Sequence, residues 1–253
     1  MPTIRGQSIL IIGGSSGIGA AVAEYACSDG VKVSIASSNR ARVEKAAKKI
    51  QASVPAAKIL GFTVDLGQYD LESRLEQLLK DVVDATGGPL DHVIVTAGTG
   101  NMVSLSEYTA TAFQDCAPLH FIAPLMVGKV APRFMNQHWK SSIIFTSGAF
   151  GKKPAKGYCV IASAVGALDA ATRALALELA PIRVNAVSPG PTVTEMFGPP
   201  SEALDKAVAA MGAQSLLGKL GRPEDVAEAY LYLMRDTNTT GTIVDSNGGA
   251  FLQ

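Results

Sequence analysis

A glycine-rich segment near the N-terminus has the composition and spacing of a phosphate-binding loop. It reads GGSSGIG over residues 13–19, follows the hydrophobic run Ser8–Ile12, and precedes a helical pattern that begins near Ala20. Glycines permit a tight turn, and a helix N-terminus presents free N–H groups and a positive dipole end. The segment therefore predicts binding of a diphosphate. The alternative is packing, because any tight strand-to-helix turn needs glycine.

The end of the second predicted strand carries hydrogen-bond donors where an acidic residue would select NAD. These residues are Ser37, Ser38, Asn39 and Arg40. Hydroxyl, amide and guanidinium groups donate to a 2′-phosphate, whereas Asp or Glu accepts from ribose hydroxyls. The pattern favours NADP(H), with a solvated loop and helix cap as the alternative. Asp65, after the third predicted strand, is a candidate acceptor for an adenine amino group or a helix cap.

Three further side chains are candidates for proton transfer or substrate contact. His120 can donate a proton or position a substrate; the alternative is a structural histidine in a helix bent near Pro118 and Pro124. Tyr158 offers a hydrogen bond to a substrate, or is a packing tyrosine. Ser147 is expected to satisfy backbone groups at the end of a strand.

Seven hydrophobic runs of strand length alternate with amphipathic helical patterns, and these elements must position the candidate residues. The runs are Ser8–Ile12, Lys32–Ala36, Lys58–Val64, His92–Val95, Ser142–Thr146, Arg183–Val187 and Thr242–Asp245. The helical patterns include Ala20–Ser28, Ala41–Gln51, Leu71–Val83 and Ser163–Leu179. This alternation predicts an α/β fold: a Rossmann-like, doubly wound, seven-stranded parallel sheet with helices on both faces. Ligands bind such folds at the carboxyl ends of the strands.

Composition favours a globular protein that acts on small molecules. The 253 residues are 47% hydrophobic and 17% charged, and the formal net charge is zero. These values exclude disordered, collagen-like and coiled-coil classes, and they predict neither a nucleic-acid nor a membrane partner. The cysteines Cys27, Cys116 and Cys159 show no metal-ligand or disulfide spacing, and no secretory leader is recognised, so we expect a cytoplasmic protein without a metal. Cys159 is expected to be buried, and the lysines of segment 152–156 to be solvated.

These motifs resemble the short-chain dehydrogenase/reductase family from Ser8 to about Gly249. Further matching segments are Asp65-Leu66, Thr96-Ala97-Gly98, Arg183-Val184-Asn185, Ser188-Pro189-Gly190, Thr240-Gly241 and the stretch from Asp245 to Gly249. The resemblance implies one NADP(H)-binding domain over residues 1–253, strand order 3-2-1-4-5-6-7, and a homodimer or homotetramer. It also implies a substrate lid at about 191–217, for which simple core packing is the alternative.

The resemblance further implies a set of cofactor contacts. They are Gly13, Ser15, Ser16, Gly17, Ile18 and Gly19 for the phosphates; Ser37, Ser38, Asn39 and Arg40 for the 2′-phosphate; Asp65, Leu66, Ala97 and Gly98 for the adenosine; and Pro189, Gly190, Thr192 and Thr194 for the nicotinamide.

The family's Ser-Tyr-Lys-Asn catalytic positions carry other residues in this alignment. The family needs a Tyr and a Lys four residues apart on one helix, where the ammonium lowers the pKa of the phenol. Alignment on residues 172–179 places the four positions, in the order Ser, Tyr, Lys and Asn, at Gly148, Ile161, Val165 and His120. A shifted register recovers Tyr158 but no lysine, because none occurs between Tyr158 and Leu179.

The loss of this acid favours an activated substrate. Hydride addition to a neutral ketone creates an alkoxide that needs a proton, whereas an iminium ion needs none. We therefore predict an NADP(H)-dependent oxidoreductase that reduces a C=N or similar bond of an apolar secondary metabolite, with His120, Ser147 and Tyr158 as remaining polar candidates. Fungal family members of alkaloid biosynthesis, imine reductases and cyclases including a Diels–Alderase, resemble this pattern. The alternative is a cofactor-binding, non-redox scaffold, either cyclase-like or regulatory.

Overall fold

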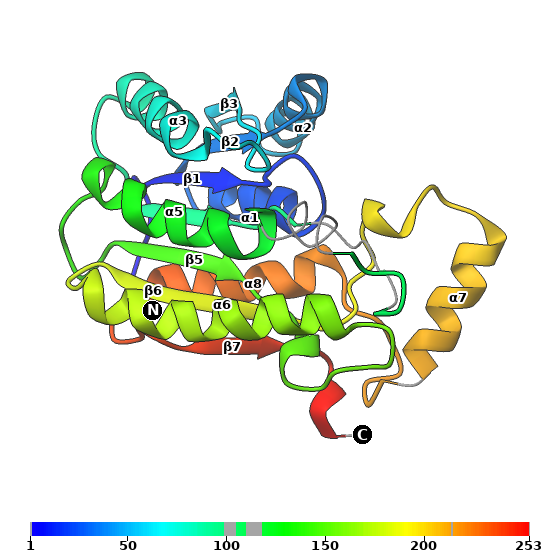
Figure 1. Cartoon of the computed structure of the whole chain (residues 1–253). Coiled ribbons are helices and arrows are strands. Elements are labelled where there is room, and N and C mark those ends of the chain that lie inside the picture. The colour runs from blue at the N-terminus through cyan, green and yellow to red at the C-terminus, as the bar shows by residue number, and fades with distance from the viewer. Residues whose placement is uncertain (1, 99–104, 110–117, 214, 253) are drawn as a thin grey trace.

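Seven parallel strands form one sheet in the order β3-β2-β1-β4-β5-β6-β7, which confirms the predicted fold class and strand order (Figure 1). The computed structural model describes residues 2–98, 105–109, 118–213 and 215–252. The strands are β1 (Ser8–Ile12), β2 (Lys32–Ser37), β3 (Ile59–Thr63), β4 (His92–Val95), β5 (Ser142–Thr146), β6 (Arg183–Pro189) and β7 (Ile243–Ser246). Each overlaps the hydrophobic run that predicted it, because burial on both faces selects continuous apolar sequence, and β2, β6 and β7 end one or two residues later than predicted.

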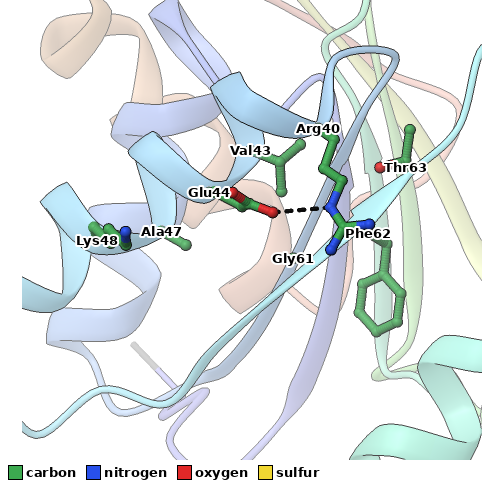
Figure 2. A pocket seen from close by; sticks show the side chains of 8 residues that line it. All are labelled: Arg40, Val43, Glu44, Ala47, Lys48, Gly61, Phe62 and Thr63. Atoms are coloured by element: carbon green, nitrogen blue, oxygen red, sulfur yellow. Dashed lines mark hydrogen bonds and ion pairs between the residues drawn. The ribbon is translucent and has the colours of Figure 1, made fainter.

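Helices cover both faces of this sheet. They are α1 (Gly17–Ser28), α2 (Arg40–Ser53), α3 (Leu71–Thr86), α5 (Ala123–Val130), α6 (Cys159–Glu178), α7 (Glu202–Ala213) and α8 (Pro223–Arg235), with short turns η1 (Pro118–Ile122), η2 (Ala131–Phe134), η3 (Ala149–Gly151), η4 (Glu195–Phe197) and η5 (Ala250–Leu252). In Figure 1, α5 and α6 lie in front of the sheet and α8 behind it, while α7 stands beyond the carboxyl ends of the strands. Helix α2 packs beside the edge strand β3 (Figure 2).

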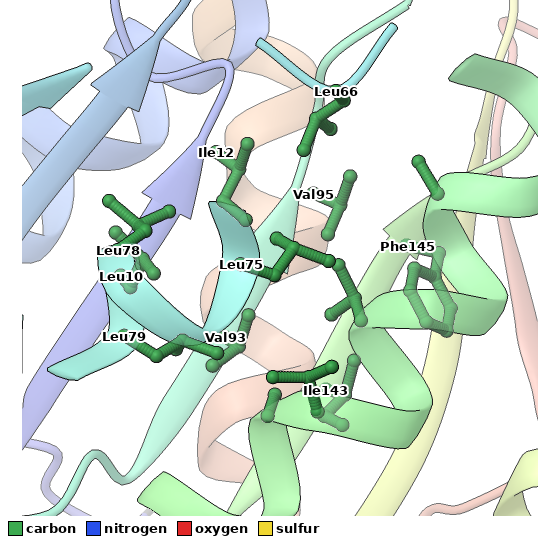
Figure 3. Close-up of a cluster of buried hydrophobic side chains, with 14 of the residues drawn as sticks. Leu10, Ile12, Leu66, Leu75, Leu78, Leu79, Val93, Val95, Ile143 and Phe145 are labelled. Atoms are coloured by element: carbon green, nitrogen blue, oxygen red, sulfur yellow. The ribbon is translucent and has the colours of Figure 1, made fainter. Parts of the chain in front are cut away.

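Two buried clusters hold the layers together, one on each face of the sheet. Alternate residues of a strand point to opposite faces. On β1, Leu10 and Ile12 therefore join the cluster with α3, α5 and α6 (Figure 3), whereas Ile9 and Ile11 join the cluster with α1, α2 and α8. These side chains are at most 1% exposed. The sheet is thus a rigid, close-packed base for the loops that leave its carboxyl edge.

The strand order reverses at β1, which lies between β2 and β4. Backbone hydrogen bonds continue past the strand ends at this point: Gly13 N–H donates to Ala36 O at 2.8 Å, and Thr96 N–H donates to Ile12 O at 2.8 Å. Parallel α/β folds bind ligands at such a switch point. The loops after β1, β2 and β4 therefore define where the functional site must lie.

Helix α6 is the long apolar helix of the fold. Among the described residues it is the one helix whose length and composition would suit a membrane span, a test that the core helix of a folded domain also passes. It packs on β6 and η3, and Val165, Leu168 and Leu175 are buried against the sheet. Its other face carries the exposed side chain of Leu177.

Candidate active site

The glycine loop after β1 lies directly against the end of β4. Gly13 has φ of +100°, and a Cβ there would lie 2.5 Å from both Ala97 N and Thr96 Oγ1. A Cβ on Gly19 would lie 2.4 Å from the carbonyl oxygen of Gly13. Only glycine fits these contacts. The packing role left open by the sequence is therefore real at Gly13 and Gly19, where the loop backbone passes close to the end of β4 and to itself.

The N-terminus of α1 receives an acidic side chain from a distant segment. The Gly17 N–H donates to Glu195 Oε2 at 2.9 Å, although the two residues are 178 positions apart. The N-cap residue Ser16 makes no side-chain capping bond, and the first turn of α1 carries no acidic residue. A helix N-terminus attracts anions. Glu195 therefore lies where Ser15, Ser16 and Ile18 were predicted to surround a diphosphate, and no sequence pattern pointed to it.

The segment after β2 divides its polar groups between a helix cap and an open groove. Asn39 Oδ1 accepts from the Arg42 N–H at 2.9 Å and so caps α2, while Ser37 Oγ accepts from the Asn39 N–H at 3.4 Å. Ser38 is exposed. Arg40 Nε donates to Glu44 Oε1 at 2.9 Å on the rim of a groove of about 440 Å³ between α2 and β3 (Figure 2). The helix-cap alternative thus holds for the Asn39 side-chain oxygen, whereas Arg40 stays exposed at the predicted 2′-phosphate position.

The two residues after β3 have different surroundings. Asp65 accepts from the Gly67 N–H at 3.0 Å and from Gln68 Nε2 at 2.7 Å, and these hydrogen bonds lower the pKa of its carboxyl. Its predicted capping role is wrong, because α3 begins only at Leu71, after the N-cap residue Asp70. Leu66 is 3% exposed and packs in the cluster with α3, α5 and α6, so its side chain is a core group.

Three of the four aligned catalytic positions lie side by side beyond β4 and β5. Val165 is 8% exposed, and its methyl groups lie 3.0 and 3.7 Å from where a Cβ on Gly151 and on Gly148 would be. Val165 and His120 line one small cavity, together with Ala97, Phe145 and Thr146. The His120 ring also faces Gly98, whose Cβ would lie 3.6 Å from His120 Cε1. His120 belongs to the π-helical turn η1, and Ile161 lies one turn before Val165 on α6.

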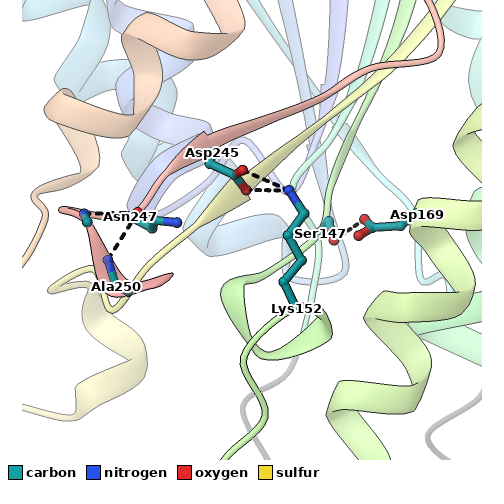
Figure 4. Close-up of polar contacts among 7 residues, drawn as sticks. Ser147, Lys152, Asp169, Asp245, Asn247 and Ala250 are labelled. Atoms are coloured by element: carbon teal, nitrogen blue, oxygen red, sulfur yellow. Dashed lines mark hydrogen bonds and ion pairs between the residues drawn. The ribbon is translucent and has the colours of Figure 1, made fainter. Parts of the chain in front are cut away.

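The other polar candidates turn away from this cavity. Ser147 Oγ donates to Asp169 Oδ1 at 2.5 Å, and both residues are buried, so the predicted bond from the Ser147 side chain to strand-end backbone groups is wrong (Figure 4). Tyr158 precedes α6 as its N-cap residue and stacks on Phe150, with ring centroids 4.2 Å apart. Asp169 could have been recognised in the sequence, since it interrupts the apolar stripe of its helix and a buried carboxylate needs a donor.

The loop after β6 closes the site from the opposite side. The Gly190 N–H donates to Ser246 O at 3.0 Å, and Thr192 Oγ1 donates to Gly190 O at 2.9 Å. Thr194 Oγ1 accepts from the Met196 N–H at 3.3 Å, and its methyl group lies 3.1 Å from where a Cβ on Gly17 would be. The predicted nicotinamide segment, which begins at Pro189 at the end of β6, therefore contacts the glycine loop itself.

Segment 191–217 and the C-terminal residues lie next to each other, since a Cβ on Gly249 would lie 2.6 Å from Leu216 Cδ1. Exposed apolar side chains gather on the segment, namely Met196, Met211, Leu216 and Leu217; Gln214 lies outside the described residues, as does Cys116. Lys152 Nζ binds both carboxylate oxygens of Asp245 at 2.7 and 2.8 Å (Figure 4). Lys153 Nζ donates to Ala250 O at 2.9 Å. Both lysines are exposed, as expected for a solvated loop, and they are also held by acceptors 93 and 97 positions away, one on β7 and one on the turn η5. Cys159, expected to be buried, is exposed at the start of α6.

Comparison with known proteins shows what this chain is similar to. A family model described as an SDR-like Rossmann domain matches residues 3–253. A protein named short-chain dehydrogenase/reductase ATR9, from Stachybotrys chlorohalonatus, is 91% identical over 100% of both chains. The solved MalC reductase/Diels–Alderase from Malbranchea aurantiaca has a TM-score of 0.91 at 36% identity, covering 99% of this chain and 98% of its own. A short-chain dehydrogenase from Burkholderia cenocepacia, solved with NADP, has a TM-score of 0.86 at 26% identity, covering 99% and 100%.

Proposed function

The chain belongs to the short-chain dehydrogenase/reductase family and is an oxidoreductase, and from this premise we propose that it uses NADP(H) to reduce an activated C=N bond in an apolar secondary metabolite. The observation that carries the proposal is the position of the apolar Val165 side chain. This buried side chain packs on the loop around Gly148 and lines the His120 cavity, at the position where the alignment expects a lysine. An isopropyl group neither binds a cofactor ribose nor lowers the pKa of a neighbouring acid.

The residues around α1 and β2 fit the cofactor. An anion, the Glu195 carboxylate, already accepts a hydrogen bond at the α1 N-terminus, which supports this end of the helix as the diphosphate site. Arg40 would bind the 2′-phosphate together with the hydroxyl groups of Ser37 and Ser38. Its guanidinium would then either leave Glu44, with which it forms an exposed ion pair, or contact Glu44 and the phosphate at once. Leu66 would contribute only backbone groups, because its side chain is in the core. Bound NADPH supplies a hydride.

The proton balance explains the choice of substrate. A hydride added to the carbon of an iminium ion donates two electrons, the C=N π pair moves onto nitrogen, and a neutral amine forms without any proton. The same addition to a ketone leaves an alkoxide that must be protonated or held by donors. Ile161 and Val165 provide neither, so the role left to this site is to orient the substrate beside the cofactor and exclude water. His120 is the polar side chain that we place at the substrate.

Exposed apolar side chains on segment 191–217 support a hydrophobic substrate. Met196, Met211, Leu216 and Leu217 are between 40% and 67% exposed on the segment that we propose as the substrate lid. Exposed apolar groups clustered near a site are typical of ligand-binding surfaces. The similarity to fungal proteins, including the MalC reductase/Diels–Alderase, supports a place in fungal secondary metabolism, within which alkaloid biosynthesis stays a prediction.

A second candidate is a cyclase or other non-redox scaffold that keeps the cofactor. It is favoured by the same apolar Val165 side chain, since a shaped hydrophobic pocket without an acid can template a pericyclic reaction, and by the two activities in the name of the MalC relative. The predicted assembly into homodimers or homotetramers, the cytoplasmic location and the lack of nucleic-acid or membrane partners stay predictions.

The test combines cofactor binding with a matched substrate panel. The purified protein is titrated calorimetrically with NADPH, NADP⁺ and NADH, and NADPH oxidation is then followed with cyclic iminium ions and with ketones of the same carbon skeleton. We expect NADPH to bind at least about tenfold more tightly than NADH, and only the iminium ions to turn over. Turnover of ketones would contradict the argument from the missing acid. Tight binding without turnover of any substrate would favour the scaffold.

A further inference from the structure

Glu195 places a carboxylate against the glycine loop at the N-terminus of α1. It belongs to η4, the short turn that begins the proposed lid, and its Oε2 atom accepts the Gly17 N–H at 2.9 Å. Helix α1 has no capping side chain of its own at Ser16 and no acid in its first turn. Glu195 therefore supplies from another element the negative charge that a helix N-terminus favours.

The loop holds this carboxylate in place. Thr194 caps η4 by accepting the Met196 N–H at 3.3 Å, and the Phe197 N–H donates to Thr194 O at 3.0 Å. Upstream, the Val193 N–H donates to Gly221 O at 2.9 Å. The methyl group of Thr194 packs over Gly17 at the same time. The contact is thus made by an anchored turn, while the Glu195 side chain itself remains exposed and able to leave.

The same N–H group is one that the proposed cofactor needs. A diphosphate at the α1 N-terminus would accept from Gly17 and its neighbours, and it carries negative charge like the carboxylate. Two anions cannot share one donor without strong repulsion. Cofactor binding and the Glu195 contact therefore exclude each other.

We propose that Glu195 is a built-in competitor for the cofactor diphosphate: its carboxylate occupies the Gly17 N–H in the absence of cofactor, lowers the affinity for NADP(H), and leaves α1 when the cofactor binds. This inference rests on the proposed function. Because the turn η4 is anchored, only the Glu195 side chain moves, and the exposed side chain of Met196 beside it stays in place.

The test removes the charge and keeps the shape. Glu195→Gln keeps an oxygen that can accept from Gly17 but cannot compete as an anion, so we expect NADPH to bind about three- to tenfold more tightly than to the wild type. Without cofactor, the variant should melt slightly earlier, because the helix terminus loses its anion. Glu202→Gln is the matched control: it neutralises another exposed lid acid, which pairs with Lys206 on α7. It should leave the NADPH Kd unchanged.

The outcomes separate this inference from the proposed function. If the wild type binds NADPH and Glu195→Gln binds it equally or more weakly, the inference is wrong and the cofactor assignment stands. Tighter binding by both glutamine variants would indicate a general charge effect and would also overturn the inference. Glu195→Ala serves as a second variant should glutamine prevent folding, with the same expected tightening. If none of the variants nor the wild type binds NADPH, the proposed function fails and the inference fails with it.

Discussion

At the residue scale, the chemistry of the site depends on three neighbouring positions. Val165, Gly148 and His120 come from α6, the loop after β5 and the turn before α5; Val165 and His120 line one small cavity, and Val165 also packs beside Gly148. The register that equates Val165 with the family's lysine stays a prediction. It can be tested by rebuilding the missing acid.

Restoring the family's residues should create ketone reduction. We expect Gly148→Ser, Ile161→Tyr and Val165→Lys combined to raise the rate of NADPH-dependent ketone reduction by at least about tenfold, because a positioned phenol next to an ammonium donates the proton that an alkoxide needs. The measurement is steady-state NADPH oxidation with a ketone. The control is a triple variant in which Val165→Met takes the place of Val165→Lys, because methionine is similar in length to lysine and carries no charge. Equal rates for both triple variants would contradict the assigned register.

The cysteines offer a second prediction at this scale. Burial, with the nearby Glu24 carboxylate, raises the pKa of Cys27 to about 11, so at pH 8 only about one thiol in a thousand is the reactive thiolate. Cys27 is also 4% exposed, whereas Cys159 is open to solvent. Brief labelling of the native protein with iodoacetamide, followed by peptide mass spectrometry, should modify Cys159 and leave Cys27 unmodified. Labelling in denaturant is the control, and native labelling of Cys27 would show that α1 opens.

At the scale of elements, contacts at helix termini and between loops position the residues of the site. The loop after β5 is joined to the C-terminal strand by Lys152 and Asp245, the loop after β6 is joined to α1 by Glu195, and the start of α8 is held by the Asp225 side chain. Asp225 accepts from the Arg222 N–H at 3.1 Å and from Lys219 Nζ at 2.9 Å. These bonds join the segment that follows the proposed lid to the first turn of α8.

The Asp225 cap should make stability depend on acid pH. Its bond from Lys219 and that from the Arg222 backbone lower the pKa of the carboxyl to about 2, from 3.8. A carboxyl whose pKa is lowered by folding stabilises the folded state at pH values above the pKa of the unfolded chain. This contribution to stability disappears as the pH falls from about 4 towards 2. We expect Asp225→Ala to lower the free energy of unfolding by about 1 kcal/mol at pH 7, a modest value because the cap is partly exposed.

Urea denaturation from pH 7 down to about pH 3 measures this effect. The difference between wild type and Asp225→Ala should narrow on the acid side. Glu224→Ala removes an exposed acid from the same helical turn, and its effect should be smaller. A difference for Asp225→Ala that stays constant across the pH range would contradict the assigned cap.

At the scale of the whole molecule, the outer face of α6 is exposed to solvent in the part of the chain that the structure describes. The helix is long and apolar, yet only 28% of its most apolar 18-residue stretch is buried, and the side chain of Leu177 is 84% exposed. Small exposed residues such as Ala170 and Ala174 lie on the same helix and permit close approach of a second helix. This face is consistent with the predicted homodimer or homotetramer.

Charge on this face should weaken self-association. We expect the protein to sediment as a dimer or tetramer, and Ala170→Arg with Ala174→Arg to weaken the association at least about tenfold, because burying unpaired guanidinium groups is costly. Sedimentation velocity over a concentration series measures the shift. Ala52→Arg, a single alanine-to-arginine change on the exposed part of α2, should leave the assembly intact. A monomeric wild type would contradict the prediction.

The sequence by itself determined the elements and their order. Buried parallel strands require continuous apolar runs and glycine turns, and these local patterns survive without knowledge of the partners, so all seven strands and the site-bearing loops could be predicted. Sequence similarity to the family supplied the strand order and the aligned catalytic positions. Only the tertiary structure decided which side chains meet. Ser147 bonds Asp169, Lys152 bonds Asp245, Leu66 enters the core, and Glu195 reaches α1. Such pairs join residues 22 to 178 positions apart, and local periodicity carries no information about a partner at that distance because chain folding alone brings the two together.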